Sequence, residues 1–195
     1  MRTFIAILGF VAAPAMAEIR VEFFRLLAPD GREMYQASDL HDGRIGERDG
    51  FWIVCDRNGG PSAGRIYFIS RETLARAEHT RDIRADEAFV IAPPAQGWAA
   101  LEAETPPENR EMVAEISRRI VGDERTDEPY LDLEAVTVAP ALAGGDTAHL
   151  FVVAEEPHSA ILELALPAER DGKRELPARL VSVHAYREKP EDQGA

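Results

Sequence analysis

Residues 51–57, Phe-Trp-Ile-Val-Cys-Asp-Arg, and residues 65–69, Arg-Ile-Tyr-Phe-Ile, carry the strongest structural signal in the chain. Both runs are rich in aromatic and β-branched residues, which favour β-strands. A loop of asparagine, glycine, proline and serine separates them. Apolar runs bounded by such turn residues predict two neighbouring antiparallel strands.

A second copy of this unit lies further along the chain. It consists of Leu-Phe-Val-Val-Ala-Glu-Glu at residues 150–156, a Pro-His-Ser turn, and Ala-Ile-Leu-Glu-Leu-Ala-Leu at residues 160–166. An Asp-Leu pair precedes both copies, as Asp39-Leu40 and Asp132-Leu133. Two hairpins with the same flanking residues indicate a repeated β-sheet unit.

Further strands are predicted where apolar and polar residues alternate or where β-branched residues cluster. These segments are residues 19–27, 89–92, 131–138 and 180–186. The Asp-Gly pairs at residues 42–43 and 49–50 predict turns.

One helix is predicted, over residues 109–120, because Met112, Val113 and Ile116 recur at helical spacing with charged residues between them. Residues 72–78 favour no more than a helical turn, and residues 98–104 show no clear period.

The predicted fold class is mainly β, with propeller-like repeats of antiparallel strands. Repeats of about forty residues with a few strands each are typical of β-propeller blades. A β-sandwich is the alternative, since it also consists of short strands and turns. An open propeller would expose sheet edges, so we expect the chain to close with irregular segments or to form a homodimer.

Residues 1–17 resemble a secretory signal peptide. Arg2 supplies positive charge, residues 4–13 are apolar, and Ala15-Met16-Ala17 has the pattern of a cleavage site. The apolar part is too short for a membrane span. We therefore expect a periplasmic or secreted protein with a single domain over residues 18–186 and a flexible tail over residues 187–195.

The chain has a formal net charge of −13. Such a charge repels polyanions, so nucleic acids and anionic membrane surfaces are excluded as expected partners. A cation, a small molecule or an envelope protein fits this charge better. Cys55 is the only cysteine, which excludes a disulfide within the chain, and its apolar surroundings predict a buried, inert thiol.

Four carboxylates flank the second repeat and form the predicted metal site: Asp132, Glu134, Glu155 and Glu156. If the strand ends bring them together, they repel one another unless a cation or a shared proton relieves the repulsion. Carboxylate oxygens are the ligands that calcium prefers, so we expect Ca²⁺. The alternative is a set of solvated turn residues.

A second group of residues predicts ligand binding. Asp56 and Arg57 precede a glycine-rich loop whose backbone N–H groups could donate hydrogen bonds to an anion, and Arg65 could add a charge-assisted hydrogen bond. His158, beside the acidic pair 155–156, is the histidine best placed in the sequence to act as an acid or base. An ordinary surface turn with an ion pair is the alternative.

Residues 132–136, Asp-Leu-Glu-Ala-Val, and residues 151–156 resemble the Asp-x-Glu-Gly-aliphatic and strand-Glu-Glu patterns of the phytase-like domain. This group is also known as the esterase-like activity of phytase family, and residues 51–57 resemble an earlier strand of it. Ala135 stands where that pattern has glycine, and the chain is shorter than a complete member.

The resemblance implies an exported, propeller-like protein that hydrolyses phosphate or carboxylic esters with the help of a metal ion. Residues 60–64, Gly-Pro-Ser-Ala-Gly, match the G-x-S-x-G pattern, but they lie in the loop between two predicted antiparallel strands and not in the strand-turn-helix context of a nucleophile elbow. The sequence contains no H-E-x-x-H zinc motif. A non-catalytic module that binds a ligand or an envelope protein therefore stands beside the enzyme hypothesis.

Overall fold

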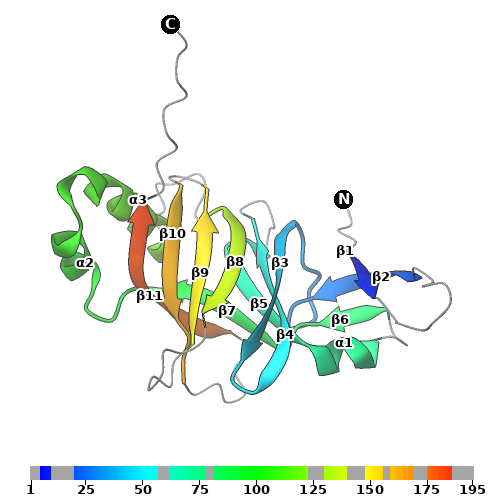
Figure 1. Ribbon diagram of the computed structural model, residues 1–195. Coiled ribbons are helices and arrows are strands. Elements are labelled where there is room, and N and C mark those ends of the chain that lie inside the picture. Colours follow the sequence, from blue (N-terminus) through cyan, green and yellow to red (C-terminus); the bar gives the residue numbers. More distant parts are fainter. Residues whose placement is uncertain are drawn as a thin grey trace, which may run out of the picture.

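The computed structural model describes residues 5–9, 20–56, 62–77, 81–122, 130–139, 148–155, 159–168 and 175–185. Within these residues the chain is mainly β, as predicted. Eight strands form one large sheet and three strands form a smaller one (Figure 1).

The large sheet contains both predicted repeats. Its strands, in spatial order, are β3 (Ala37–Ile45), β4 (Arg48–Cys55), β5 (Arg65–Ser70), β7 (Glu87–Ala92), β11 (Leu176–Ala185), β10 (Ala160–Ala165), β9 (His149–Ala154) and β8 (Leu133–Ala139). Neighbouring strands are antiparallel except for β7 and β11, which are parallel. The hairpins predicted around residues 51–69 and 150–166 are confirmed as β4–β5 and β9–β10.

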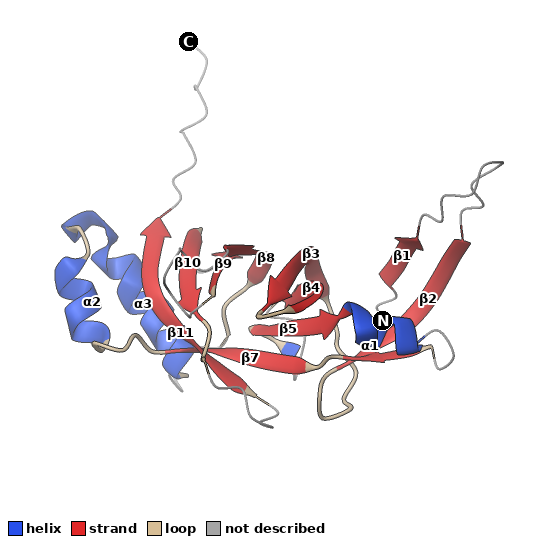
Figure 2. Ribbon diagram, turned by 60° about the horizontal axis from the view of Figure 1, so that its bottom comes forward, coloured by secondary structure: helices blue, strands red, loops and turns tan. Residues whose placement is uncertain are grey.

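The large sheet is nearly closed, because its first and last strands, β3 and β8, lie against each other. The backbone N–H of Val136 donates to the Asp39 carboxylate at 3.0 Å, and Thr137 Oγ1 lies 3.1 Å from His41 Nε2. Figure 2 shows β8 and β3 above β5 and β7, so that the sheet surrounds an interior. Each of the two end strands therefore covers the other, and the homodimer stays a prediction.

The two Asp-Gly turn predictions are wrong. Residues 42–43 lie inside β3 and residues 49–50 inside β4, where Gly43 faces Gly50. The chain reverses at residues 46–47 instead, and Gly46 takes the positive φ of 59° that a two-residue hairpin loop needs. Gly43 serves close packing: a Cβ atom there would lie 2.6 Å from Val138 Cγ1.

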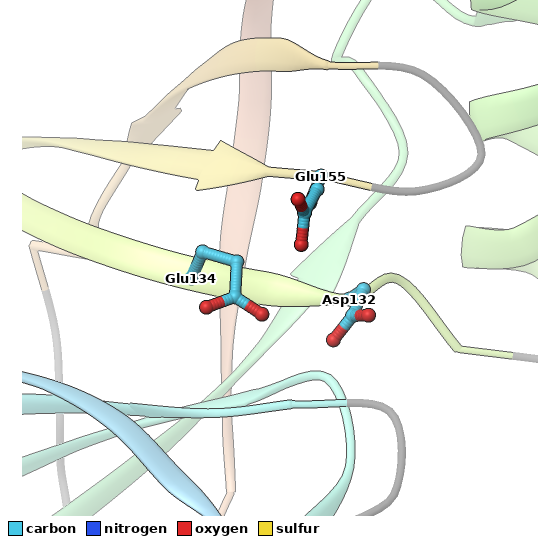
Figure 3. Close-up of side chains that lie close together, drawn as sticks. All are labelled: Asp132, Glu134 and Glu155. Atoms are coloured by element: carbon cyan, nitrogen blue, oxygen red, sulfur yellow. The ribbon is translucent and has the colours of Figure 1, made fainter.

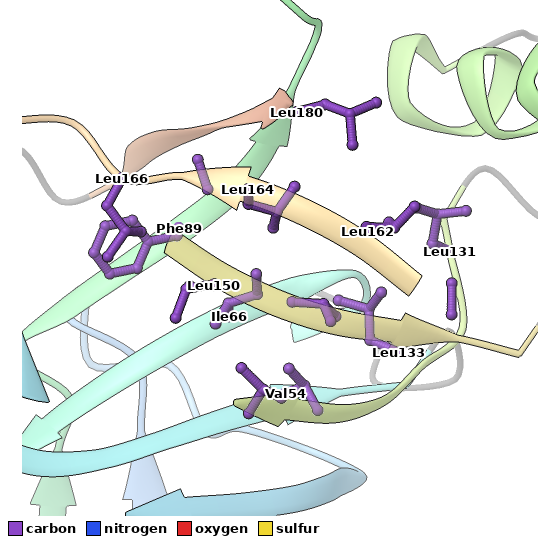
Figure 4. Packing of buried hydrophobic residues seen from close by; sticks show 14 of the residues in the cluster. Val54, Ile66, Phe89, Leu131, Leu133, Leu150, Leu162, Leu164, Leu166 and Leu180 are labelled. Carbon is purple, nitrogen blue, oxygen red and sulfur yellow. The ribbon is translucent and has the colours of Figure 1, made fainter. Parts of the chain in front are cut away.

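Apolar side chains fill the interior of the large sheet. Trp52, Phe68 and Phe89 are fully buried, and the Trp52 ring centroid lies 5.0 Å from that of Phe68 and 5.6 Å from that of Phe89. Leucine and valine side chains from β8, β9 and β10 complete this core (Figure 4). The side chains alternate between the two faces because successive residues of a strand point in opposite directions.

The outer face of β4 and β5 is buried as well. Ile53, Cys55, Tyr67 and Ile69 belong to a second core. Ala88 of β7 also belongs to it, and its other members come from the smaller sheet and its surroundings. That sheet consists of β1 (Ile5–Gly9), β2 (Arg20–Leu27) and β6 (Asp82–Arg84), and α1 (Arg71–Ala77) packs beside it. The predicted strand 19–27 is thus confirmed as β2.

Strand β1 lies within the predicted signal peptide and pairs antiparallel with β2. Cleavage after residue 17 and the single domain over residues 18–186 stay predictions. The predicted tail, residues 187–195, lies outside the described residues.

Two further helices pack beside β11 (Figure 1). These are α2 (Trp98–Glu104) and α3 (Arg110–Val121), separated by a short 3₁₀ turn, η2 (Pro107–Asn109). Met112, Val113 and Ile116 of α3 join the interior core, which confirms the helix predicted over residues 109–120. In the described part of the chain, no helix has the length and apolar character needed to cross a membrane.

The contact between β3 and β8 can be tested by Gly43→Ala. The new methyl group would lie 2.6 Å from Val138 Cγ1 and 3.0 Å from Trp52 Cδ1, so overpacking should lower the free energy of unfolding by roughly 1–3 kcal/mol. Urea unfolding measures this change. Val138→Ala removes the nearest obstacle, so the double variant should lose less stability than the two single changes together. Simple additivity would contradict the close approach of β3 and β8.

Candidate metal centre

Three carboxylates meet where β8 begins and β9 ends. Asp132 precedes β8, Glu134 lies on β8, and Glu155 follows β9 (Figure 3). One oxygen atom from each carboxylate lies within 4.8 Å of the others. These three residues are called the acidic cluster below. A group of this size could hold a metal ion.

A β-bulge and a backbone hydrogen bond build the acidic cluster. Leu133 pairs with Ala154 but Ala135 pairs with Val153, so Glu134 is the extra residue of β8. A bulge of this kind redirects side chains and is common beside functional sites. The backbone N–H of Glu155 donates to the Asp132 carbonyl at 3.0 Å and joins the two strand ends. Ala135, which replaces the glycine of the phytase-like pattern, is half-buried within this bulge.

Burial and the neighbouring carboxylates disfavour the ionised form of Glu134 in the acidic cluster. Asp132 is buried, with 7% of its surface exposed, whereas Glu134 is half-buried and Glu155 is exposed. Burial raises the pKa of Glu134, and the charges of Asp132, Glu155 and Asp56 raise it further. A positive ion at this place would relieve both the desolvation and the repulsion.

Asp56 acts on the acidic cluster, although the sequence placed it in an anion-binding loop. Its charge contributes to the raised pKa of Glu134. Gln36, which has a positive φ of 51°, holds Asp56 in place. The Asp56 backbone N–H donates to the Gln36 carbonyl at 3.1 Å, and the Gln36 amide, with its nitrogen turned toward Asp56, donates to both carboxylate oxygens at 2.7 and 2.9 Å.

Arg65, the other predicted ligand-binding residue that the structure describes, is paired within the protein. Arg65 forms an ion pair with Glu175 at 2.5 Å and donates to the Ala63 carbonyl at 3.3 Å. Arg57 and His158, predicted to bind a ligand, and Glu156, predicted to bind the metal, lie outside the described residues, so their roles stay predictions.

Cys55 is a buried free thiol, as predicted. Burial raises its pKa to about 12, and the nearby Asp56 charge acts in the same direction. Because the thiolate is the reactive form, this cysteine is unsuited to nucleophilic chemistry.

The sequence analysis missed a chain of hydrogen bonds on the outer face of β9, β10 and β11. His149 Nδ1 lies 2.6 Å from Glu163 Oε1, and Ser182 Oγ donates to Glu163 Oε2 at 2.7 Å. The same Ser182 oxygen lies 2.8 Å from His184 Nε2. Only the spacing of Ser182 and His184, two residues apart on one strand, is visible in the sequence; their proximity to Glu163 depends on the pairing of β10 with β11.

This chain of residues connects strands and does not form a catalytic triad. In a triad the carboxylate holds the histidine that activates the serine, whereas Glu163 contacts Ser182 directly. The Ser182 hydroxyl lowers the pKa of Glu163, and the hydrogen bond and charge of His149 lower it further. The carboxylate is thus stabilised in its ionised form.

The fold and the site define a mainly β protein with an acidic cluster that could hold a metal ion. No known protein family, curated protein or solved structure matches the chain. The resemblance to the phytase-like domain stays a prediction.

Removing the negative charge of Glu134 should raise the melting temperature, whereas removing that of Glu163 should lower it. At neutral pH and without metal, Glu134→Gln should raise the melting temperature, because the native state no longer holds an unfavourable charge. Glu163→Gln should lower it, because the native state loses a favoured charge. Thermal melts followed by circular dichroism, from neutral pH downward, measure both effects.

The pH dependence separates these effects from packing changes. Because the pKa of Glu134 is raised in the native state, its ionised form lowers the free energy of unfolding of the wild-type protein at neutral pH. This cost disappears as the pH falls from the raised native pKa to the ordinary glutamate pKa of about 4.3. The advantage of Glu134→Gln should disappear over that range. The difference in melting temperature between the wild-type protein and Glu163→Gln should shrink as the pH falls through the lowered native pKa of Glu163. Differences that do not change with pH would refute the electrostatic explanation.

Proposed function

We propose that this chain is an exported protein that holds Ca²⁺ in the acidic cluster and binds a small molecule or an envelope protein in its cation-loaded form. The observation that carries the proposal is the convergence of Asp132, Glu134 and Glu155 within 4.8 Å. The raised pKa of Glu134 supports it, since a positive ion would offset the charges of Asp132, Glu155 and Asp56 that raise this pKa.

The donor atoms favour calcium over other metals. Every side chain of the cluster offers carboxylate oxygen, and no histidine or cysteine belongs to it in the described part of the chain. Zinc prefers nitrogen and sulfur ligands, and magnesium requires nearly ideal octahedral geometry. Calcium takes six to eight oxygens in flexible arrangements. Water and the neighbouring Asp56 are suitable sources of further oxygens.

Metal-assisted ester hydrolysis is the second candidate function. The exposure of Glu155 favours it, because the cluster is open to solvent and a bound cation can keep a water molecule. The resemblance to the phytase-like domain points in the same direction. A cation would also reduce the repulsion between this acidic protein and a phosphate ester. Against it stands the set of side chains: the acidic cluster itself contains no histidine, serine or lysine.

Calcium should stabilise the folded protein by mass action. At a hundredfold excess over the dissociation constant, the expected gain is about 2.7 kcal/mol. Thermal melts with calcium and with a chelator measure it. Glu134→Gln and Glu155→Gln should remove most of this gain while leaving the apo protein folded. Glu104→Gln, on an exposed residue of α2, is the matched control and should keep the full gain. Equal melting temperatures with calcium and with chelator would refute the cation site.

Turnover distinguishes the two candidate functions. The calcium-loaded protein is given a chromogenic phosphate ester and a chromogenic carboxylic ester, and product release is followed by absorbance. We expect weak or no turnover, because the acidic cluster consists of carboxylates alone, with no histidine, hydroxyl or thiol beside them in the cluster. Turnover that requires calcium and is lost in Glu134→Gln would instead establish the hydrolase.

A further inference from the structure

We infer that a second site in this protein binds a small apolar carboxylate. A hollow of about 320 Å³ lies between the start of β5, β7, the end of α3 and residues 130–131. Asp132, Glu134 and Glu155 are absent from its lining. The inference therefore goes beyond the proposed cation site and stands without it.

The walls of the hollow are largely apolar. Val90 and Ile91 come from β7, Ile120 and Val121 from α3, and Leu131 from the segment before β8. Ile91 and Ile120 also pack against the interior core, so this wall is held firmly. A concave apolar surface with a few polar groups is the usual form of a small-molecule site.

Exposed apolar side chains gather at this hollow. Val121 is 64% exposed and Tyr130 is 43% exposed, the two highest values among the large hydrophobic residues that the structure describes as exposed. A single exposed hydrophobic residue has no special meaning. Two beside one hollow provide an apolar surface that a ligand could cover.

Two arginines supply positive charge at the same place. The Arg119 side chain is 12% exposed and that of Arg65 is 20% exposed, so both guanidinium groups are held within the protein surface. Arg65 pairs with Glu175, and Arg119 lies 3.7 Å from Glu115 and donates to the Tyr130 carbonyl at 3.4 Å. A guanidinium has five N–H donors in a planar fork, so it can contact a ligand carboxylate while it pairs with the protein.

The charge and the size define the ligand class. The net charge of −13 makes this protein repel anions in general. The two arginines that line the hollow favour an anion there. The apolar wall favours a hydrocarbon or aromatic body. Ligand pockets range from about 300 to 1,000 Å³, and this hollow lies at the lower end. The ligand is therefore a small monocarboxylate with an aliphatic or aromatic body.

Displacement of a fluorescent apolar anion tests the ligand class. Anilinonaphthalene sulfonate is bound to the full chain in the presence of a chelator and is then displaced by octanoate, octanol or octylammonium. Octanoate should displace it at a concentration roughly tenfold lower than octanol or octylammonium, because only octanoate has both a negative charge and an apolar body. Equal displacement by octanol, or no binding of the probe, would overturn the inference.

Variants locate the binding. Val121→Asp places a negative charge on an exposed residue of the hollow and should weaken octanoate binding by roughly tenfold or more. Val181→Asp changes another exposed valine, on β11 and outside the hollow, and should leave binding unchanged. Arg119→Met should also weaken binding, and Arg119→Lys should restore part of it. Equal effects of Val121→Asp and Val181→Asp would overturn the inference.

Glu134→Gln separates this site from the cation proposal. This variant should lose the calcium response and keep the affinity for octanoate, since residue 134 does not line the hollow. Loss of octanoate binding in this folded variant would contradict an independent site. A missing calcium response in the wild-type protein would refute only the cation proposal.

Discussion

The hydrogen bond from the Val136 backbone N–H to the Asp39 carboxylate lies at the centre of this structure, because it joins the two ends of the large sheet. A sheet of eight strands that stayed open would leave β3 and β8 with unpaired backbone groups. Here a side chain takes the place of a backbone partner. The absence of a side chain at Gly43 lets Val138 approach β3. Closure then creates the enclosed interior that Trp52 and its neighbours fill.

Closure also determines where chemistry can take place. Side chains in the middle of β4 and β5 are buried on both faces, so the polar groups of these two strands lie at their ends. Three carboxylates lie near one rim of the sheet: Asp56 at the end of β4, Glu155 at the end of β9 and Asp132 before β8. The charge of each one raises the pKa of Glu134. The start of β5 contributes Arg65 to the neighbouring hollow. Leu131 lines that hollow, and the next residue, Asp132, begins the acidic cluster.

The bulge at Glu134 shows how packing and electrostatics are connected. The extra residue allows Leu133 and Val136 to face the core together, with Glu134 and Ala135 between them. The consequence is a half-buried carboxylate beside two others, and its burial and their charges raise its pKa. Glu163 shows the opposite case on the outer face, where a hydroxyl and an imidazole stabilise the charge. The same residue type thus belongs to a candidate metal site at one place and stabilises cross-strand contacts at another.

The sequence alone determined many of the local elements of this protein, although strand pairing overrode the turn preference of the Asp-Gly pairs at residues 42–43 and 49–50. Aromatic and β-branched runs predicted both hairpins, and the spacing of Met112, Val113 and Ile116 predicted α3, because these preferences act over a few residues. The carboxylates at 132, 134 and 155 were found because they flank a recognisable repeat. Tertiary structure decided which distant residues meet. The contact of β3 with β8, the position of Asp56 beside the acidic cluster, and the hydrogen bonds from His149 to His184 all depend on strand pairing. Local propensity does not specify that pairing, since it arises from closing a whole sheet around a shared core.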